Sequence, residues 1–122
     1  MSRYVTKDSG KRIHYKSGMM RDADPTKARF DLIIPLDVPY EDQILTRFAE
    51  LMRRGAEKYS ARNWEKADSQ TELDRFKESA MRHIFQWFCG ETDEDHAAGV
   101  LFNIMGYETV KYKLYNNKKA KK

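Results

Sequence analysis

Three carboxylates in this chain have a setting that suits a divalent metal ion. Glu50, Glu78 and Asp95 lie in or beside three separate segments whose apolar residues recur at helical intervals. Oxygen ligands that converge from several helices of a bundle suit Mg²⁺, which is a hard cation. The single cysteine and the scattered histidines give no zinc-ligand spacing. These residue types favour an oxygen-rich magnesium site, provided that the three segments pack together.

The segment GETDEDHAAGVLFN, residues 90–103, places four carboxylates and a histidine before an apolar stretch. Acids near a helix N-terminus offset the helix dipole and cap its free amides. Hard carboxylate oxygens also hold divalent cations. Taken alone, the segment favours the capping interpretation, because acidic first turns are common in helices.

Polar and small residues share one stripe of the helix that follows. His96, Gly99, Asn103 and Gly106 are three to four residues apart and so lie on one face. Each glycine inside a helix costs about 1 kcal/mol relative to alanine. Two interpretations are equally good: close helix packing with Asn103 bonded to a neighbouring backbone, or a ligand pocket against this helix.

Other charged residues have an ordinary explanation beside a functional one. Glu78 and Arg82 are four residues apart, so an exposed ion pair of about 0.2–0.5 kcal/mol is the simpler interpretation. Glu50 and Glu57 share a face that points away from the apolar stripe of their helix. That face becomes functional only if another helix or subunit covers it.

Three helices must position these residues. The hydrophobic spacing predicts a first helix after Pro39, a second opened by the Ser69–Glu72 capping box and ended by Gly90, and a third over about 95–114. Their broad apolar surfaces indicate an all-α bundle with an irregular N-terminal arm, completed by oligomerisation. We expect a mobile N-terminal segment over residues 1–24, one helical domain over 25–115 and a basic disordered tail over 116–122.

Charge and composition exclude some classes of protein. The 122-residue chain has a net charge of +4, and its lysines gather at the end of the chain, at Lys118, Lys119, Lys121 and Lys122. No apolar run approaches the roughly 18 residues of a membrane helix, and the N-terminus lacks a signal-peptide core. The single Cys89 suits a reducing compartment. We expect a cytoplasmic protein, in the host cytoplasm if a phage encodes it.

Three stretches, taken in order, resemble one known family. They are GMMRDADPTKARFDLIIP at residues 18–35, AELMRRGAEKYSARNWEK at 49–66 and SAMRHIFQWFCGETDEDHAAGVLFN at 79–103. Each stretch is a weak signal alone, but the ordered combination is specific. It is similar to a phage and prophage family of dATP/dGTP diphosphohydrolases, which is related in concept to the MazG-like all-α nucleoside triphosphate pyrophosphatases.

The resemblance implies an enzyme that cleaves a purine deoxynucleoside triphosphate to the monophosphate and pyrophosphate. It implies Mg²⁺ as cofactor, with Mn²⁺ as a possible substitute, and a homo-oligomer. The implied catalytic and metal-binding acids are Glu50, Glu78 and Asp95, so that Asp95 both caps its helix and serves the metal. The MazG E-x-x-E pair is not intact, because Arg54 stands three residues before Glu57. The implied substrate-binding residues are Lys58, Tyr59, Asn63, Trp64, Arg82, His83, His96 and Asn103, with Lys27 and Arg29 as further cations.

Two alternatives remain open. A small basic protein with a lysine-rich tail and several aromatic residues can hold single-stranded nucleic acid without being an enzyme. The position of the lysines at the chain end argues against nucleic acid as a partner. The second alternative keeps the fold and the reaction but takes another triphosphate, since the sequence does not determine base or sugar preference.

Overall fold

A computed structural model describes residues 4–24 and 26–120 of the chain. The ends of the expected N-terminal segment and of the expected tail, residues 1–3 and 121–122, lie outside the described residues, as does residue 25. The chain divides into two compact units, Met1–Ile34 and Pro35–Lys122, and each is described by itself. The boundary therefore falls ten residues after the one expected from the sequence.

The first unit contains a β-hairpin where the sequence analysis expected irregular structure. Strands β1 (Arg12–His14) and β2 (Met20–Asp22) pair antiparallel, with Ile13 opposite Arg21. The turn between them uses Gly18 at a φ of 92°, a left-handed conformation that costs glycine little. The Ser17–Gly18 dipeptide is the turn signal that the sequence analysis passed over. The 3₁₀ helix η1 (Phe30–Ile33) follows in this unit.

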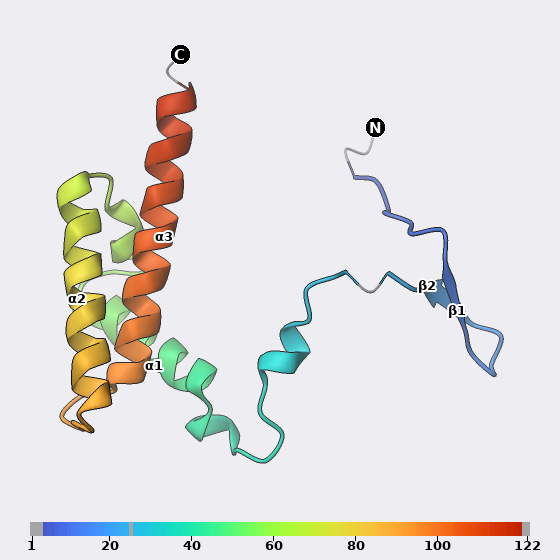
Figure 1. Ribbon diagram of the computed structural model, residues 1–122, viewed down its shortest axis with the longest axis horizontal. Coiled ribbons are helices and arrows are strands. Elements are labelled where there is room, and N and C mark those ends of the chain that lie inside the picture. Colours follow the sequence, from blue (N-terminus) through green and yellow to red (C-terminus); the bar gives the residue numbers. More distant parts are fainter. Residues whose placement is uncertain (1–3, 25, 121–122) are drawn as a thin grey trace. The chain divides into compact units, whose positions relative to one another are not determined.

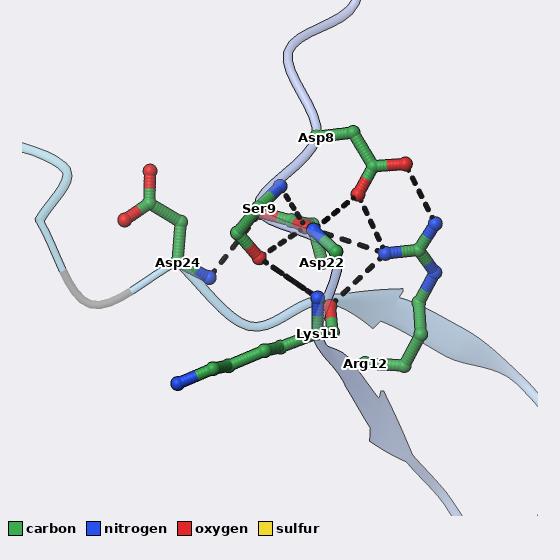
Figure 2. A network of polar contacts seen from close by, with 7 residues as sticks. Asp8, Ser9, Lys11, Arg12, Asp22 and Asp24 are labelled. Atoms are coloured by element: carbon green, nitrogen blue, oxygen red, sulfur yellow. Dashed lines mark hydrogen bonds and ion pairs between the residues drawn. The ribbon is translucent and has the colours of Figure 1, made fainter.

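A polar network joins the base of this hairpin (Figure 2). The Asp22 carboxylate accepts hydrogen bonds from the Ser9 hydroxyl at 2.7 Å and the Ser9 amide at 2.9 Å. The Arg12 guanidinium donates to both oxygens of Asp8, at 2.7 and 2.8 Å. Hydrogen bonds from Arg12 and from the Gly10 amide hold the pKa of the Asp8 carboxyl well below its usual range. All of these groups are near solvent, so we assign them a local role in shaping the hairpin.

The second unit is helical, which confirms the all-α fold class. It contains α1 (Ile44–Lys58), α2 (Gln70–Phe88) and α3 (His96–Ala120), with short 3₁₀ helices η2 (Tyr40–Asp42) and η3 (Asn63–Lys66). Helices α2 and α3 lie side by side and antiparallel, and α1 also packs against α3 (Figure 1). No described helix is long and apolar enough to cross a membrane.

The predicted ends of α2 are confirmed. Ser69 is the N-cap, and its hydroxyl oxygen accepts a 3.3 Å hydrogen bond from the Glu72 amide. The Glu72 carboxylate folds back over this end of the helix, where it accepts from the Asp68 amide at 3.0 Å and from the Ser69 hydroxyl at 2.6 Å, a variant of the capping box. At the other end Gly90 has a φ of 77°, the left-handed conformation that commonly follows a helix.

Helix α3 continues farther than expected. It ends at Ala120 rather than near Leu114, so residues 116–120 are helical where the sequence analysis expected a disordered tail. Lysine is a good helix former, and positive charge is favoured near a helix C-terminus. These preferences explain why a basic segment extends this helix.

Two glycines let α3 approach α2 closely. A Cβ atom at Gly106 would lie 2.4 Å from the ring of Phe76, and one at Gly99 would lie 2.9 Å from the ring of His83. The stripe of His96, Gly99, Asn103 and Gly106 is therefore filled along part of its length by side chains of α2. Leu73 and Val110 form the buried core beside this contact.

We expect Gly106→Ala to lower the melting temperature. Overpacking of this kind costs about 1–3 kcal/mol, which exceeds the roughly 1 kcal/mol gained when alanine replaces a helical glycine. Gly55→Ala is the matched control, because nothing lies within 4 Å of a Cβ atom at Gly55 in α1. Thermal unfolding should show the control slightly stabilised. A Gly106→Ala protein as stable as the Gly55→Ala protein would contradict this account of the α2–α3 contact.

Candidate functional site

Two neighbouring cavities open between the helices of the second unit. The first, which we name the charged cavity, has a volume of about 530 Å³ and lies against α1, α2, α3 and the loop between α2 and α3. Its polar lining contains cations, acids, a histidine and an amide: Arg54, Ser79, Arg82, His83, Asp93, Glu94, Asp95 and Asn103. The arrangement suits an anionic ligand accompanied by a cation.

The second, which we name the aromatic cavity, has a volume of about 560 Å³ and lies between the C-terminal half of α1 and η3. Its lining includes four residues that the sequence analysis proposed for substrate binding, Lys58, Tyr59, Asn63 and Trp64. The two cavities share Leu51, Arg54 and Phe102 in their walls. A ligand with an apolar planar end and an anionic end therefore has room for each end.

Asp95 stands at the start of α3. Its Oδ1 atom accepts a 3.2 Å hydrogen bond from the Ala98 amide, which confirms the predicted capping role. The Arg47 guanidinium donates to both of its oxygens, at 2.8 and 2.7 Å. These hydrogen bonds from Arg47 are the main reason that the pKa of Asp95 lies below its ordinary value. Asp95 is therefore ionised at neutral pH and joins α1 to α3.

His83 and His96 form a buried pair at the wall of the charged cavity. Their Nδ1 atoms are 2.9 Å apart, and His96 Nε2 lies 2.7 Å from Asp93 Oδ1. The Asp93 carboxylate can only accept, so His96 donates to it from Nε2. When each ring carries one proton, His96 Nδ1 is then an acceptor, and His83 donates to it from Nδ1. The His83 Nε2 atom, 3.4 Å from the Arg82 guanidinium, is left as an acceptor. Burial lowers the pKa of His83, which favours this neutral form.

The ion pair expected between Glu78 and Arg82 is not formed. Glu78 lies 3.6 Å from Arg75, which precedes it by one helical turn. Arg82 instead donates to Gln86 at 2.9 Å and lies 4.0 Å from Glu94 in the loop before α3. The prediction was wrong because an acid distant in sequence attracts Arg82 toward the charged cavity, while a nearer arginine is available to Glu78.

Asn103 makes a hydrogen bond within its own helix and also lines the charged cavity, so its substrate-binding role stays a prediction. Its Nδ2 atom donates a 2.7 Å hydrogen bond to the Gly99 carbonyl, one turn earlier on α3, and the residue is 5% exposed. No buried side-chain oxygen or nitrogen among the described residues lacks a hydrogen-bond partner. Asn103 Oδ1 accepts no hydrogen bond from these residues, so it must be open to the charged cavity that Asn103 lines.

The expected metal-binding acids do not gather within the described chain. Glu50 bonds to Arg53, which also bonds to Glu57, and Glu78 lies beside Arg75. Neither Glu50 nor Glu78 is part of the lining of either cavity. Two groups of potential ligand atoms within 4.8 Å of one another occur among the described residues: His83, Glu94 and His96, and Glu91, Asp93 and His96.

The remaining predicted site residues are distributed as follows. Arg82, His83, Asp95 and Asn103 line the charged cavity, and His96 is 2% exposed and contacts it through His83. Lys27 and Arg29 belong to the first unit, where Arg29 pairs with Asp31 at 2.7 Å. Their substrate-binding role stays a prediction.

Sequence reasoning missed Arg47, Arg54, Asp93 and Glu94 as site residues. Asp93 and Glu94 were visible in the acidic segment but were assigned only to the helix cap. Arg54 was noticed solely as the residue that interrupts an E-x-x-E pair. The two arginines have no distinguishing local pattern, since α1 contains three arginines and the contacts of each depend on distant elements.

The fold and the cavities define a small all-α protein in which a charged cavity adjoins an aromatic one between three helices. Comparison with known families is more specific: the family described as dATP/dGTP diphosphohydrolase, N-terminal, matches residues 17–119. The chain therefore belongs to this family, which confirms the resemblance to dATP/dGTP diphosphohydrolases found in the sequence. Searches of curated proteins and of solved structures found no match.

Proposed function

We propose that this protein is a Mg²⁺-dependent diphosphohydrolase that cleaves a purine deoxynucleoside triphosphate to the monophosphate and pyrophosphate. The observation that carries the proposal is the pair of adjoining cavities with a shared wall. A deoxynucleoside triphosphate has one planar apolar end and one end with about four negative charges. The family name supports dATP and dGTP as substrates.

The purine is assigned to the aromatic cavity. Trp64 and Tyr59 offer ring faces on which a base can stack, and Asn63 offers an amide to its edge. Lys58 lies 5.2 Å from the centre of the Tyr59 ring and supplies a positive charge at this cavity. A purine covers more of such a surface than a pyrimidine, which favours the larger base.

The phosphates are assigned to the charged cavity. Arg82 can donate two parallel hydrogen bonds to phosphate oxygens, as guanidinium groups commonly do. His83 Nε2 and Asn103 Oδ1 are acceptors in the same cavity and can orient the attacking water or the sugar hydroxyl. In the reaction the water oxygen bonds to the α-phosphorus, the bond to the bridging oxygen breaks, and its electron pair leaves with pyrophosphate. One water proton is released.

The donor chemistry of the charged cavity fits a magnesium ion. Asp93, Glu94 and Asp95 line it with carboxylate oxygens, which Mg²⁺ prefers. We assign the ion to Asp95, as expected from the sequence, together with Glu94. Glu50 and Glu78 are exposed on the described chain and would contribute only where a second chain brings them to the cavity. When bound there, Mg²⁺ would neutralise phosphate charge and polarise the phosphoryl group under attack.

We propose further that the protein is a homo-oligomer. Large apolar side chains of α2 are exposed on the described chain: Met81 is 62%, Phe85 67%, Trp87 59% and Phe88 79% exposed. An exposed patch of this kind usually marks an interaction site. Light scattering should give a mass above that of one chain, and Phe88→Ser should reduce it. A monomeric wild-type protein would contradict this part of the proposal.

No observation favours the alternative of a nucleic-acid-binding protein over an enzyme. The side chains that suggested it lie at the very end of the chain, whereas Trp64 and Tyr59 line a cavity. The test of the proposed function is to incubate the protein with dATP or dGTP and Mg²⁺ and to separate the products. A monophosphate and pyrophosphate are expected, and inorganic phosphate as the only inorganic product would reject the proposal.

A further inference from the structure

Arg54 differs from the other arginines of α1 in having no ion-pair partner among the described residues. Arg47 donates to both oxygens of Asp95, and Arg53 bonds to Glu50 and Glu57. Side chains with long flexible stems and charged ends usually pair or extend into solvent. Arg54 is exposed and forms part of the wall of both cavities, so its guanidinium is accessible to an anionic ligand there, although its charge also acts on the Asp95 carboxylate.

Arg54 also lies at a particular place between the two cavities. It is one of three residues that line both, and the other two, Leu51 and Phe102, are apolar. Arg82 lines the charged cavity but not the aromatic cavity. The boundary between the cavities is therefore formed by two apolar side chains and one cation.

The chemistry of the substrate identifies what reaches this boundary. In a nucleoside triphosphate the α-phosphate is the phosphate attached to the sugar, so it lies between the base and the two outer phosphates. With the base in the aromatic cavity and the outer phosphates in the charged cavity, the α-phosphate lies where the cavities meet. This step rests on the proposed function, because it uses the same placement of the nucleotide.

We propose that Arg54 binds the α-phosphate of the nucleotide and stabilises the charge that develops on it during hydrolysis. The water oxygen forms a bond to the α-phosphorus, and the bond to the α,β-bridging oxygen breaks with its electron pair leaving on pyrophosphate. One proton of the water is released to solvent. The non-bridging oxygens of the α-phosphate carry the negative charge, and a planar guanidinium can donate two hydrogen bonds to them.

Binding of two compounds, each corresponding to one part of the substrate, distinguishes the role of Arg54 from that of Arg82. Deoxyadenosine monophosphate contains the base and the α-phosphate, and inorganic pyrophosphate stands for the outer phosphates. Arg54→Gln should weaken binding of the monophosphate by about tenfold or more and leave pyrophosphate binding almost unchanged. Arg82→Gln should show the reverse. Calorimetric titration in the presence of Mg²⁺ measures both without any turnover.

The kinetic expectation is a loss of kcat that exceeds the change in KM. Removal of one donor to a developing charge typically lowers kcat by about 10²–10³-fold. Arg54→Lys keeps the positive charge but lacks the planar pair of donors. Compared with Arg54→Gln, it should therefore recover more of the monophosphate binding than of the turnover. Lys77→Gln is the control. Lys77 is an exposed cation of α2 outside both cavities, so its replacement should change neither monophosphate binding nor kcat. Melting curves verify that each variant is folded, and Arg54→Lys provides the test if Arg54→Gln is not.

The outcomes distinguish this inference from the proposed function. A wild-type protein that hydrolyses dATP and a folded Arg54→Gln protein with unchanged kcat and unchanged monophosphate binding would overturn the role of Arg54 alone. A wild-type protein that neither hydrolyses a nucleoside triphosphate nor binds the monophosphate would overturn the proposed function. Equal loss of both ligands in Arg54→Gln would also contradict the inference, since it places Arg54 specifically at the α-phosphate.

Discussion

Chelation with EDTA should abolish nucleotide hydrolysis by this protein, and an excess of Mg²⁺ or Mn²⁺ should restore it. We expect this result because two cations, Arg54 and Arg82, line the charged cavity, and they cannot by themselves neutralise the roughly four charges of a triphosphate. A divalent ion at the carboxylates of the charged cavity would supply the missing positive charge. Hydrolysis in chelator at the rate seen with Mg²⁺ would reject a metal-dependent mechanism.

Variants of the acids identify which of them hold the ion. Asp95→Asn and Glu94→Gln should raise the Mg²⁺ concentration that gives half-maximal activity, because both residues line the charged cavity. Glu50→Gln and Glu78→Gln should leave that concentration unchanged unless a second chain brings these side chains to the cavity. The same series therefore tests the three acids expected from the sequence against the two favoured by the structure.

We expect Asn103→Leu to lower turnover by at least about tenfold while the protein stays folded. A tenfold loss corresponds to roughly 1.4 kcal/mol in the barrier. Leucine is similar in size and suits a helix already apolar at Leu101, Phe102 and Ile104, so the melting temperature should rise or change little. The variant removes Asn103 Oδ1, which is open to the charged cavity. It also removes the side-chain donor to the Gly99 carbonyl, which keeps its backbone hydrogen bond within the helix.

Asn116→Leu is the matched control for this variant. Asn116 also lies on α3 and donates from Nδ2 to the carbonyl one turn earlier, that of Tyr112, at 2.9 Å. It lines neither cavity, so its replacement removes the same kind of hydrogen bond without touching the site. The control should keep wild-type turnover. A folded Asn103→Leu protein with wild-type activity would remove Asn103 from the site and leave it a purely structural amide.

The helical part of the fold was predictable because its signals are local. Ser69 and Glu72 cap α2 through groups three residues apart, and Gly90 ends it through its own backbone conformation. The acidic start of α3 was also interpreted correctly, since Asp95 caps the helix. The hairpin of the first unit was missed because its strands have only three residues each and little hydrophobic alternation, so the Ser17–Gly18 turn was their main signal.

The site was less predictable, because its contacts join residues that are far apart in the sequence. Arg47 bonds to Asp95 across 48 positions, and Glu94 attracts Arg82 away from the nearer Glu78. Neither contact follows from helical spacing. The position of Arg54 between two cavities requires the packing of α1 against α3 and η3, which no local pattern encodes. Arg82, His83 and Asn103, which the family resemblance implied for substrate binding, line one cavity, and their roles remain predictions.

Hydrolysis in water enriched in oxygen-18 tests the central claim most directly. The account predicts attack on the α-phosphorus, so the heavy oxygen should appear in the nucleoside monophosphate and be absent from the pyrophosphate. Mass spectrometry of the separated products distinguishes the two. Heavy oxygen in the pyrophosphate, or in released inorganic phosphate with a nucleoside diphosphate as the other product, would mean that water attacks a different phosphorus and would contradict the proposed reaction.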